Sequence, residues 1–545
     1  MANLEKKPFN PWLFTAAGAV IVVVLAILIA NSPDPKPAIP VGNPNVVPET
    51  VVVPETTEDL LAHGANLFAR NCATCHGAKG AGDGEAAYLL NPKPRNLVLG
   101  QYRVVRTLNG LARREDIYKV ITEGMPGSSM PPWDRLSEKD RWALTDYTLS
   151  LDSKREKKVK KLGLELLNPV APPPMDIAVL EHGRSLFQQA CALCHGSSGR
   201  GDGPQQQFDT EGYPTRPRDL TLGLYKGGGE PEEIFRRIRL GMPGSPMPAL
   251  GSISDQDAWA LTHFVKSLAK RDAQSVVRQK YQTIEATRAS GPVPEDPFSD
   301  EWLRRPATAL GLMPLWWRET RIEQVETRCA YDAEHLWVHL AWDDATQDDS
   351  QLHLQSFSDG AAVQLTSDAD PPLFAMGARG SSDVRIWFWK ASKQRDTDHG
   401  FADIQTIHPN MYTAHYQHMK GGPLAVATPF LAEGDAHDPR FLTGRGAGNV
   451  VSTPNKQPVE SLSAHGIGTV GQRVHNDEGV QGRGVWRDGR YALILRRPLK
   501  QSGAKALSLA VGEQAYVAFA VWDGNLGDRN GQKSVTIWHA LRLTP

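Results

Sequence analysis

The sequence predicts a chain of four parts: one N-terminal transmembrane helix, two small all-α domains in tandem, and a C-terminal all-β sandwich. An uncharged apolar run lies near the N-terminus. A long motif is repeated once, 119 positions further along the chain, from Cys72 to Cys191. Past about residue 300, short runs of aromatic and branched aliphatic residues replace the helical spacing of apolar positions.

The apolar run, residues 12–30, is long enough to cross a bilayer. Its nineteen residues span about 28 Å as a helix, close to the thickness of the hydrocarbon layer. Lys6 and Lys7 precede it, so the N-terminus is expected in the cytoplasm and the rest of the chain on the periplasmic side. A cleaved signal peptide is the alternative, because small residues follow the run. Since the run is long for a signal core, residues 1–30 are expected to be a retained single-pass anchor.

The rest of the chain has the composition of ordinary globular domains. A formal net charge of −1 gives no global field that would attract nucleic acid. At 545 residues the chain is too long for one ordinary domain. Residues 31–58 contain seven prolines and are expected to be an extended spacer. Residues 153–175 are expected to be a second linker, and their charge run from Lys154 to Lys161 is expected to be a solvated helix end.

Four of the five cysteines fall in two C-x-x-C-H strings. Two thiols separated by two residues can form thioethers to haem vinyl groups, and the adjacent histidine then reaches the iron. A structural zinc site is the alternative, but it would need further clustered ligands, and neither copy has a second cysteine pair. The fifth cysteine, Cys329, is expected to be buried and inert. The predicted haem c residues are the cysteines Cys72, Cys75, Cys191 and Cys194 and the iron ligands His76 and His195.

These strings belong to a longer repeat, so each marks one copy of a small helical domain. The matching pairs of segments are 63–84 with 182–203, 94–97 with 217–220, 124–131 with 241–248, and 142–145 with 259–262. A serine followed three residues later by an aspartate predicts the start of the last helix in each copy, at Ser137 and at Ser254. The two domains are expected to span residues 59–152 and 176–270.

Each copy resembles the class I cytochromes c, the monohaem fold found singly and in tandem in bacterial respiratory chains. In that family the distal iron ligand is typically the methionine of a Met-Pro string that follows a Gly-Met-Pro-Gly-like turn. The resemblance therefore implies Met130 and Met247 as distal ligands, and Met125 and Met242 as core or pocket residues. Arg95 and Arg218 occupy positions where the family often places a group near a haem propionate; a solvated loop arginine is the alternative.

Residues 299–545 are expected to form the all-β sandwich, joined to the second helical domain by a connector at 271–298. The short aromatic runs that predict its strands are bounded by Asp, Gly and Asn turns. The clearest of these runs are 336–342, 384–389 and 516–522.

This region is also similar to the haem b-binding domain of ethylbenzene dehydrogenase-type γ subunits. The matching stretches are 329–337, 374–377, 386–390, 484–490, 497–499, 521–524 and 533–538. The family binds one noncovalent haem b through a methionine and a lysine, which implies Met376 and Lys533 here. An amine binds iron only when deprotonated, so the site must lower the pKa of the lysine. The alternatives are a core methionine and a surface lysine, with Lys390, Lys500 and His539 as other ligand candidates.

The γ-subunit resemblance implies electron transfer, because such subunits pass electrons between an iron–sulfur subunit of a molybdenum enzyme and soluble carriers. We therefore expect a membrane-anchored periplasmic relay with two covalent haems c and one haem b. Its expected partners are redox proteins, including molybdopterin and iron–sulfur subunits of the dimethyl sulfoxide reductase family. No catalytic constellation stands out. Two alternatives stay open: a free-standing haem oxidase, peroxidase or reductase, and a ligand-binding β-domain carried on a dihaem cytochrome c.

Overall fold

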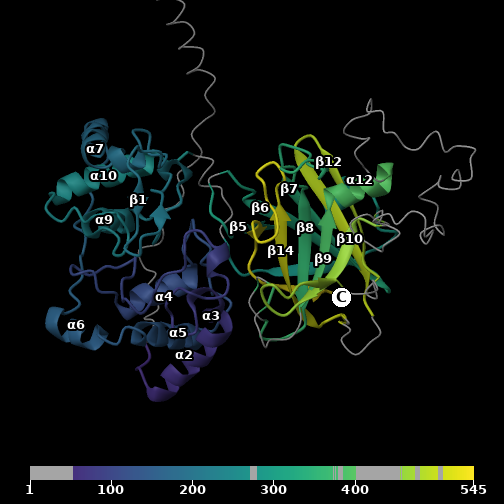
Figure 1. The fold of residues 1–545 in the computed structure, drawn as a ribbon, viewed down its shortest axis with the longest axis horizontal. Helices are drawn as coiled ribbons and strands as arrows, with labels where there is room; N and C mark the ends of the chain where they lie inside the picture. Colours follow the sequence, from purple (N-terminus) through teal and green to yellow (C-terminus); the bar gives the residue numbers. More distant parts are fainter. Residues whose placement is uncertain are drawn as a thin grey trace, which may run out of the picture. The chain divides into compact units, whose positions relative to one another are not determined.

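A computed structural model describes the chain from residue 53 onward (Figure 1). The residues after 53 that it leaves undescribed are 271–278, 319, 372–373, 375, 378–383, 401–454, 456, 473–478, 501–506 and 508. The expected anchor, residues 1–30, and most of the spacer therefore lie outside the described residues. Within the described part, no helix is both long and apolar enough to cross a membrane.

The first helical domain is built on two crossed helices, α2 (Glu58–Asn71) and α5 (Glu138–Ser150). Between them lie α3 (Ala73–His76), the 3₁₀ turn η1 (Ala87–Leu89) and α4 (Arg114–Glu123). At the crossing, a Cβ added to Gly64 would stand 2.1 Å from the carbonyl oxygen of Ala143. The glycine of the repeated His-Gly pair is therefore required for the two backbones to approach this closely.

The second helical domain repeats this arrangement. Helices α7 (Ile177–Ala190) and α10 (Asp255–Ser267) cross at Gly183, whose added Cβ would stand 2.1 Å from the carbonyl oxygen of Ala260. The remaining elements are α8 (Ala192–His195), η2 (Leu220–Leu222), α9 (Pro231–Leu240) and the short strands β1 (Gln207–Phe208) and β2 (Pro214–Thr215).

The predicted capping signals are confirmed. Ser137 accepts a hydrogen bond from the backbone N–H of Asp140 at 3.1 Å, at the start of α5. Ser254 does the same for Asp257 at 3.0 Å, at the start of α10. The charge run between the domains forms α6 (Arg155–Leu162), which has no buried residue, as expected of a solvated helix. Both features follow from contacts within one helical turn.

The C-terminal domain is β-rich, as expected, and also contains two short helices. Its elements are β3 (Thr283–Arg288), α11 (Asp300–Arg304), β4 (Thr308–Gly311), β5 (Met313–Pro314), β6 (Gln324–Tyr331), β7 (His335–Asp343), β8 (Gly360–Thr366), β9 (Val384–Lys390), α12 (Ala391–His399), β10 (Val459–Ala464), β11 (Gly471–Gln472), β12 (Gln481–Arg487), β13 (Arg490–Pro498), β14 (Gln514–Trp522), β15 (Ser534–Val535) and β16 (His539–Leu543).

The long strands form one continuous hydrogen-bonded order, β11-β10-β9-β8-β14-β16-β3-β6-β7-β13-β12. This order folds back on itself, because β7 and β13 pack against β9 although they lie far from it in the order. The Trp342 ring of β7 is 6.3 Å from Trp389 of β9 and stacks at 5.2 Å on Tyr491 of β13. An aromatic and aliphatic core lies between the two layers. Both layers therefore belong to one folded sheet, and they are not two separate sheets.

One predicted boundary is wrong, because β3 lies inside the segment 271–298 that was expected to be a connector. This strand pairs in parallel with both β16 and β6 and so joins the last strand to the rest of the sheet. Only Ile284 and Ala286 are buried in it, between polar neighbours. Two apolar residues are a weak strand signal, and their parallel partners are distant in sequence.

The β-domain also buries apolar side chains on the outer face of β8, β9 and β14. Ala362, Ile386 and Trp522 on these strands form one continuous apolar cluster with the core of the first helical domain. Polar contacts accompany this packing: the Ser129 hydroxyl donates to the Leu315 carbonyl at 2.8 Å. Arg70 pairs with Asp370 at 2.6 Å. The first helical domain and the β-domain therefore share a core.

Candidate haem sites

Both C-x-x-C-H strings adopt the same local structure, at the end of α2 and at the end of α7. The first cysteine of each string caps the preceding helix, and the histidine ends the next short helix. The Nδ1 of His76 lies 2.9 Å from the Arg95 carbonyl oxygen, and that of His195 lies 3.2 Å from the Arg218 carbonyl oxygen. Such a bond orients the ring and leaves Nε2 free for a metal. Burial lowers the pKa of both imidazoles, which favours the neutral ligand form.

A cavity of about 1610 Å³, including the part open to solvent, lies beside the first string. Cys72, Cys75 and His76 line it on one side and Met130 on another, with apolar residues between them. The residues of the first predicted haem c site are therefore brought around one space. Met125 lines the cavity as well.

The methionine turns of the two domains match closely. The Met125 N–H donates to the Met130 carbonyl at 3.0 Å, and the Met242 N–H donates to the Met247 carbonyl at 3.2 Å. In each turn a serine hydroxyl donates to the carbonyl of the first methionine at 2.7 Å. All four methionines are half-buried. The turns present their methionines in the same way, and the roles predicted for Met130 and Met247 stay predictions.

Arg95 and Arg218 are not solvated loop residues. Their carbonyls hold the histidines, and their side chains cross to the other helical domain. Arg95 donates from Nη2 to the Gly244 carbonyl at 3.2 Å, and Arg218 donates from Nη2 to the Gly127 carbonyl at 2.9 Å. Each arginine therefore joins the histidine loop of one domain to the methionine turn of the other.

Two further cationic residues, Arg103 and Lys226, lie close to these arginines, and the sequence did not single them out. Burial, together with the charges of Arg218, Arg103 and Arg95, lowers the pKa of Lys226 well below its ordinary value. Two nearby acids form ion pairs with the arginines: Asp209 lies 3.6 Å from Arg103 and Glu211 lies 4.0 Å from Arg95. The Nε atoms of Arg95 and Arg103 are buried without a hydrogen-bond partner. Such a group of buried donors fits the carboxylates of a haem.

Met376 is held in a strained backbone conformation by the β8 side chain of Gln364. Its φ of 67° lies in the left-handed region, which costs free energy for a residue with a side chain. The Gln364 amide donates to the Phe374 carbonyl at 3.0 Å and accepts from the Met376 N–H at 3.2 Å. The Met376 carbonyl accepts from Gly466 at 2.9 Å. Met376 lines the same cavity as His76.

Lys533 is not a surface lysine. It is only 7% exposed, and its Nζ lies 4.9 Å from the centre of the Trp522 ring. Burial lowers the pKa of this amine to about 8. Among the described residues no carboxylate forms an ion pair with it. Its surroundings therefore favour the uncharged amine that iron ligation would require.

Met376 and Lys533 both belong to the side of the β-domain that shares a core with the first helical domain. Trp522, beneath the lysine, lies in the same apolar cluster as Met376. The carbonyl of Lys533 accepts from the N–H of Leu315 at 3.0 Å, and Leu315 lines the cavity.

The other ligand candidates have different surroundings. Lys390 lies over the Phe388 ring at 5.2 Å, and burial lowers its pKa. Lys500 is exposed. His539 is buried, its Nδ1 accepts from the Gln282 N–H at 3.3 Å, and burial lowers its pKa to about 3. Cys329 is buried, as predicted, and burial raises the pKa of its thiol to about 12.

Three family models match the chain, one for each domain. The model described as "Ethylbenzene dehydrogenase" matches residues 315–534. The model described as "Cytochrome C oxidase, cbb3-type, subunit III" matches residues 59–147, and the one described as "Cytochrome c" matches residues 180–269.

Each of the following similar proteins covers part of the chain. A putative respiratory nitrate reductase heme subunit of Haloferax mediterranei is 24% identical over 46% of this chain and 69% of its own. The dimethylsulfide dehydrogenase subunit gamma of Rhodovulum sulfidophilum is also 24% identical, over 46% of this chain and 76% of its own. A solved chain of the Kuenenia stuttgartiensis reducing HAO-like protein complex Kustc0457/Kustc0458 is 36% identical. It covers 40% of this chain and 99% of its own, with a TM-score of 0.37.

The paired C-x-x-C-H strings, the repeated helical frame and the three matched segments agree with one another. The chain therefore consists of two cytochrome c domains followed by a domain of the ethylbenzene dehydrogenase γ-subunit family.

Proposed function

We propose that this chain relays electrons between a molybdenum oxidoreductase and the respiratory chain, through one haem b and two covalent haems c. The observation that carries the proposal is the shared cavity, where His76 and Met130 of the first cytochrome domain and Met376 of the β-domain line one space. Relatives described as a nitrate reductase heme subunit and a dimethylsulfide dehydrogenase gamma subunit support the kind of partner.

The residues of the chain would position and insulate the cofactors, and bound haems would supply one-electron chemistry. His76 and His195 would each offer a neutral Nε2, since their Nδ1 atoms are engaged by carbonyls. Met130 and Met247 would each offer an uncharged thioether, which favours reduced iron. For haem b, Met376 and Lys533 would be the ligands, with Gln364 holding the methionine loop in place.

The surroundings of the two cytochrome domains suggest an order for the relay. The first domain shares its core with the β-domain. In the second domain, Leu193 inside the C-x-x-C-H string is 60% exposed. We therefore propose that electrons pass between the β-domain and an outside partner by way of the first cytochrome domain and then the second. The crossed Arg95 and Arg218 contacts would hold these two domains together.

The location we propose is the periplasmic side of the cytoplasmic membrane, with residues 1–30 as a retained anchor. The proposal rests on the uncharged run at 12–30 and the lysines before it. Replacing residues 1–30 by a cleavable export signal is expected to release a soluble, haem-loaded protein. Persistent membrane association of that protein would mean that something other than the helix holds it.

A haem count tests the relay. In cofactor-replete protein, a pyridine haemochrome assay with acid–acetone extraction should find two covalent haems and one extractable haem, all low-spin. Lys533→Ala and Met376→Ala should each lose the extractable haem and keep both covalent ones. A high-spin haem in the wild-type protein would favour a free-standing haem enzyme. Two covalent haems with none extractable would favour a ligand-binding β-domain.

A further inference from the structure

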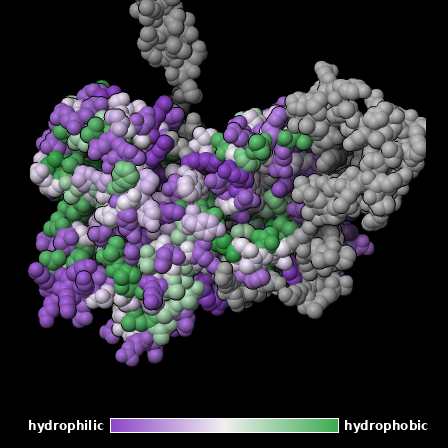
Figure 2. All heavy atoms as spheres, in the orientation of Figure 1, coloured by the Kyte–Doolittle hydropathy of each residue, from purple (hydrophilic) through white to green (hydrophobic). Residues whose placement is uncertain are grey.

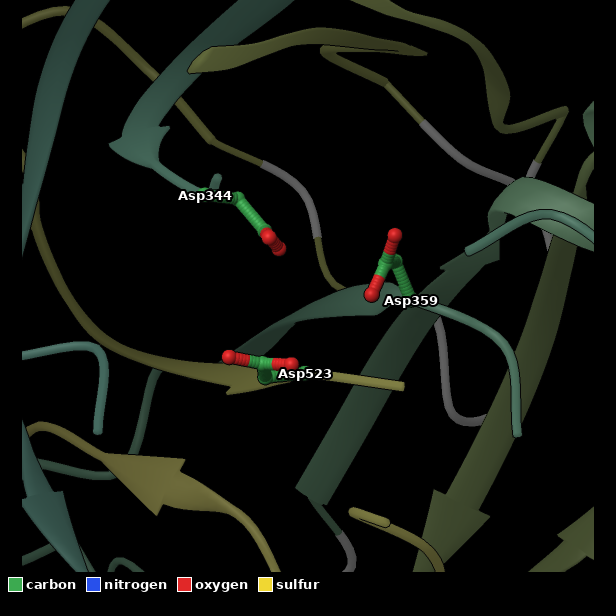
Figure 3. A group of neighbouring side chains, drawn as sticks. All are labelled: Asp344, Asp359 and Asp523. Atoms are coloured by element: carbon green, nitrogen blue, oxygen red, sulfur yellow. The ribbon is translucent and has the colours of Figure 1, made fainter. Parts of the chain in front are cut away.

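Three aspartates of the β-domain converge at one end of the folded sheet. Asp344 directly follows β7, Asp359 directly precedes β8, and Asp523 directly follows β14. One carboxylate oxygen from each lies within 4.8 Å of the other two. Figure 3 shows the three carboxylates facing a common space.

One oxygen of this group is buried without a hydrogen-bond partner among the described residues. Asp344 is only 5% exposed, and its Oδ2 is buried with no hydrogen-bond partner. Its Oδ1, in contrast, accepts from the Thr346 N–H at 3.2 Å. A buried carboxylate oxygen without a partner is costly, and the Asp344 carboxyl group is directed toward the other two aspartates (Figure 3).

Backbone donors hold the other two carboxylates in position. The Asp359 Oδ1 accepts from the Gly524 N–H at 2.8 Å, and its Oδ2 accepts from the Asp348 N–H at 2.6 Å and from the Tyr491 hydroxyl at 2.9 Å. Asp523 accepts from the Leu526 N–H at 3.0 Å. A carboxylate oxygen has two lone pairs, so the Asp359 Oδ1 retains capacity for a further partner, whereas its Oδ2 is already filled by two donors. Hydrogen bonds of this kind orient the ligands of a metal site before the metal arrives.

The nearby charges do not neutralise the group. Asp348 adds a fourth carboxylate whose charge acts on both Asp344 and Asp523. The guanidinium of Arg318 is close enough to act on Asp523 but is already paired with Asp528. The carboxylates are therefore packed more closely than their own charges favour.

We propose that Asp344, Asp359 and Asp523 bind one calcium ion that ties the two layers of the β-domain together. Calcium takes carboxylate and carbonyl oxygens at about 2.3–2.6 Å, so two of its ligands can stand up to about 5 Å apart. The observed separations fall within that limit. Magnesium usually keeps several waters and is held by one or two carboxylates, so three buried aspartates favour calcium.

The position of the site indicates a structural role. The strand β7 belongs to one layer, while β8 and β14 belong to the other and are hydrogen-bonded to each other. The strand β8 also carries Gln364, which holds the Met376 loop, and Lys533 follows Asp523 by ten residues. Bound calcium would therefore stabilise the frame from which both proposed haem b ligands project.

Metal analysis and thermal unfolding of the full, haem-loaded chain test the proposal. Protein purified in calcium-containing buffer, then passed through a desalting column, should hold about one equivalent of calcium by elemental analysis. Removing it with a chelator should lower Tm by more than about 5 °C, and calcium should restore it. The variant Asp344→Asn, which keeps the shape of the side chain, should hold no calcium and should show no response to chelator.

The matched control is Asp343→Asn, the neighbouring residue, whose side chain is 73% exposed and pairs with Arg490 outside the group. This variant should bind calcium like the wild type. Asp523→Asn is the second test if Asp344→Asn fails to fold. A wild-type chain without calcium and without a chelator response would overturn the proposal, and so would stabilisation by magnesium alone. Calcium content and the response of Tm to chelator do not depend on haem. The calcium proposal can therefore be contradicted without contradicting the proposed electron relay.

Discussion

The two cytochrome c domains share the same repeated sequence motifs but have different surroundings. In the first, Thr74 inside the C-x-x-C-H string is 7% exposed, and η1 packs beside it; the equivalent Leu193 in the second is 60% exposed. Pro131 after the first methionine turn is buried, whereas Pro248 after the second is exposed. On the face shown in Figure 2, hydrophilic and hydrophobic residues are interspersed over the described domains.

This difference shows how a repeat can acquire two roles. The first domain shares a continuous apolar cluster with the β-domain, while the second has small cores of its own. A destabilising substitution in the first domain should therefore also reduce the stability of the β-domain. The equivalent substitution in the second domain should affect that domain alone.

The largest expected effect is the loss of covalent haem. Cys72→Ala with Cys75→Ala should remove covalent haem from the first domain only, and Cys191→Ala with Cys194→Ala from the second only. Because the first cavity is also lined by Met376, only the first double variant should also weaken retention of the extractable haem. The measurement is the haemochrome count of each variant. If both double variants retained haem b equally, the first domain would be no more closely coupled to the haem b site than the second.

The next effect concerns redox potential. Met130→His and Met247→His should each keep a low-spin haem and lower its potential by on the order of 0.1 V, well inside the span of about 0.8 V that axial ligands cover. Spectroelectrochemical titration would resolve each haem. Met125→His and Met242→His are the matched controls, since these residues share the same turns. A fall in potential in the controls alone would reassign the distal ligands.

A smaller effect is expected at the helix crossings. Gly64→Ala and Gly183→Ala each push a methyl group against a carbonyl oxygen, which should cost about 3 kcal/mol of local stability. Hydrogen exchange should show Gly64→Ala loosening strands β8 and β9 as well as α2. The Gly183→Ala effect should stay within α7 and α10. Gly291→Ala, where an added Cβ meets nothing within 4 Å, is the control.

The smallest effect is expected from the crossed arginines. Arg95→Ala and Arg218→Ala should each destabilise the contact between the cytochrome domains by about 1–3 kcal/mol, since each loses buried charged hydrogen bonds. Small-angle scattering should show a larger mean separation of the domains. Arg184→Ala, at an exposed helix position, is the control. Unchanged scattering in all three variants would show that the arginines do not hold the domains together.

Much of the site was predictable because its signals are local. The haem attachment strings, the caps at Ser137 and Ser254, and the charged helix α6 each depend on residues within one or two turns of helix. The strand β3 was missed because its pairing partners lie about 40 and 255 residues away and only two of its residues are apolar.

Other residues around the predicted haem sites had no sequence signal at all. Gln364 is an ordinary polar residue in a strand, and only the fold brings its amide to the Met376 loop. Arg103 and Lys226 belong to different cytochrome domains and become a cationic group only when those domains meet.

The sequence by itself determined where the two C-x-x-C-H strings lie, where the last helix of each cytochrome c domain begins and that the last domain is β-rich, because these depend on short-range chemistry. Only the tertiary structure decided that Met376 and His76 line one cavity, that the two arginines cross between domains, and that three aspartates converge. These arrangements join residues tens to hundreds of positions apart. Their geometry depends on how faces pack, and spacing along the chain does not encode it.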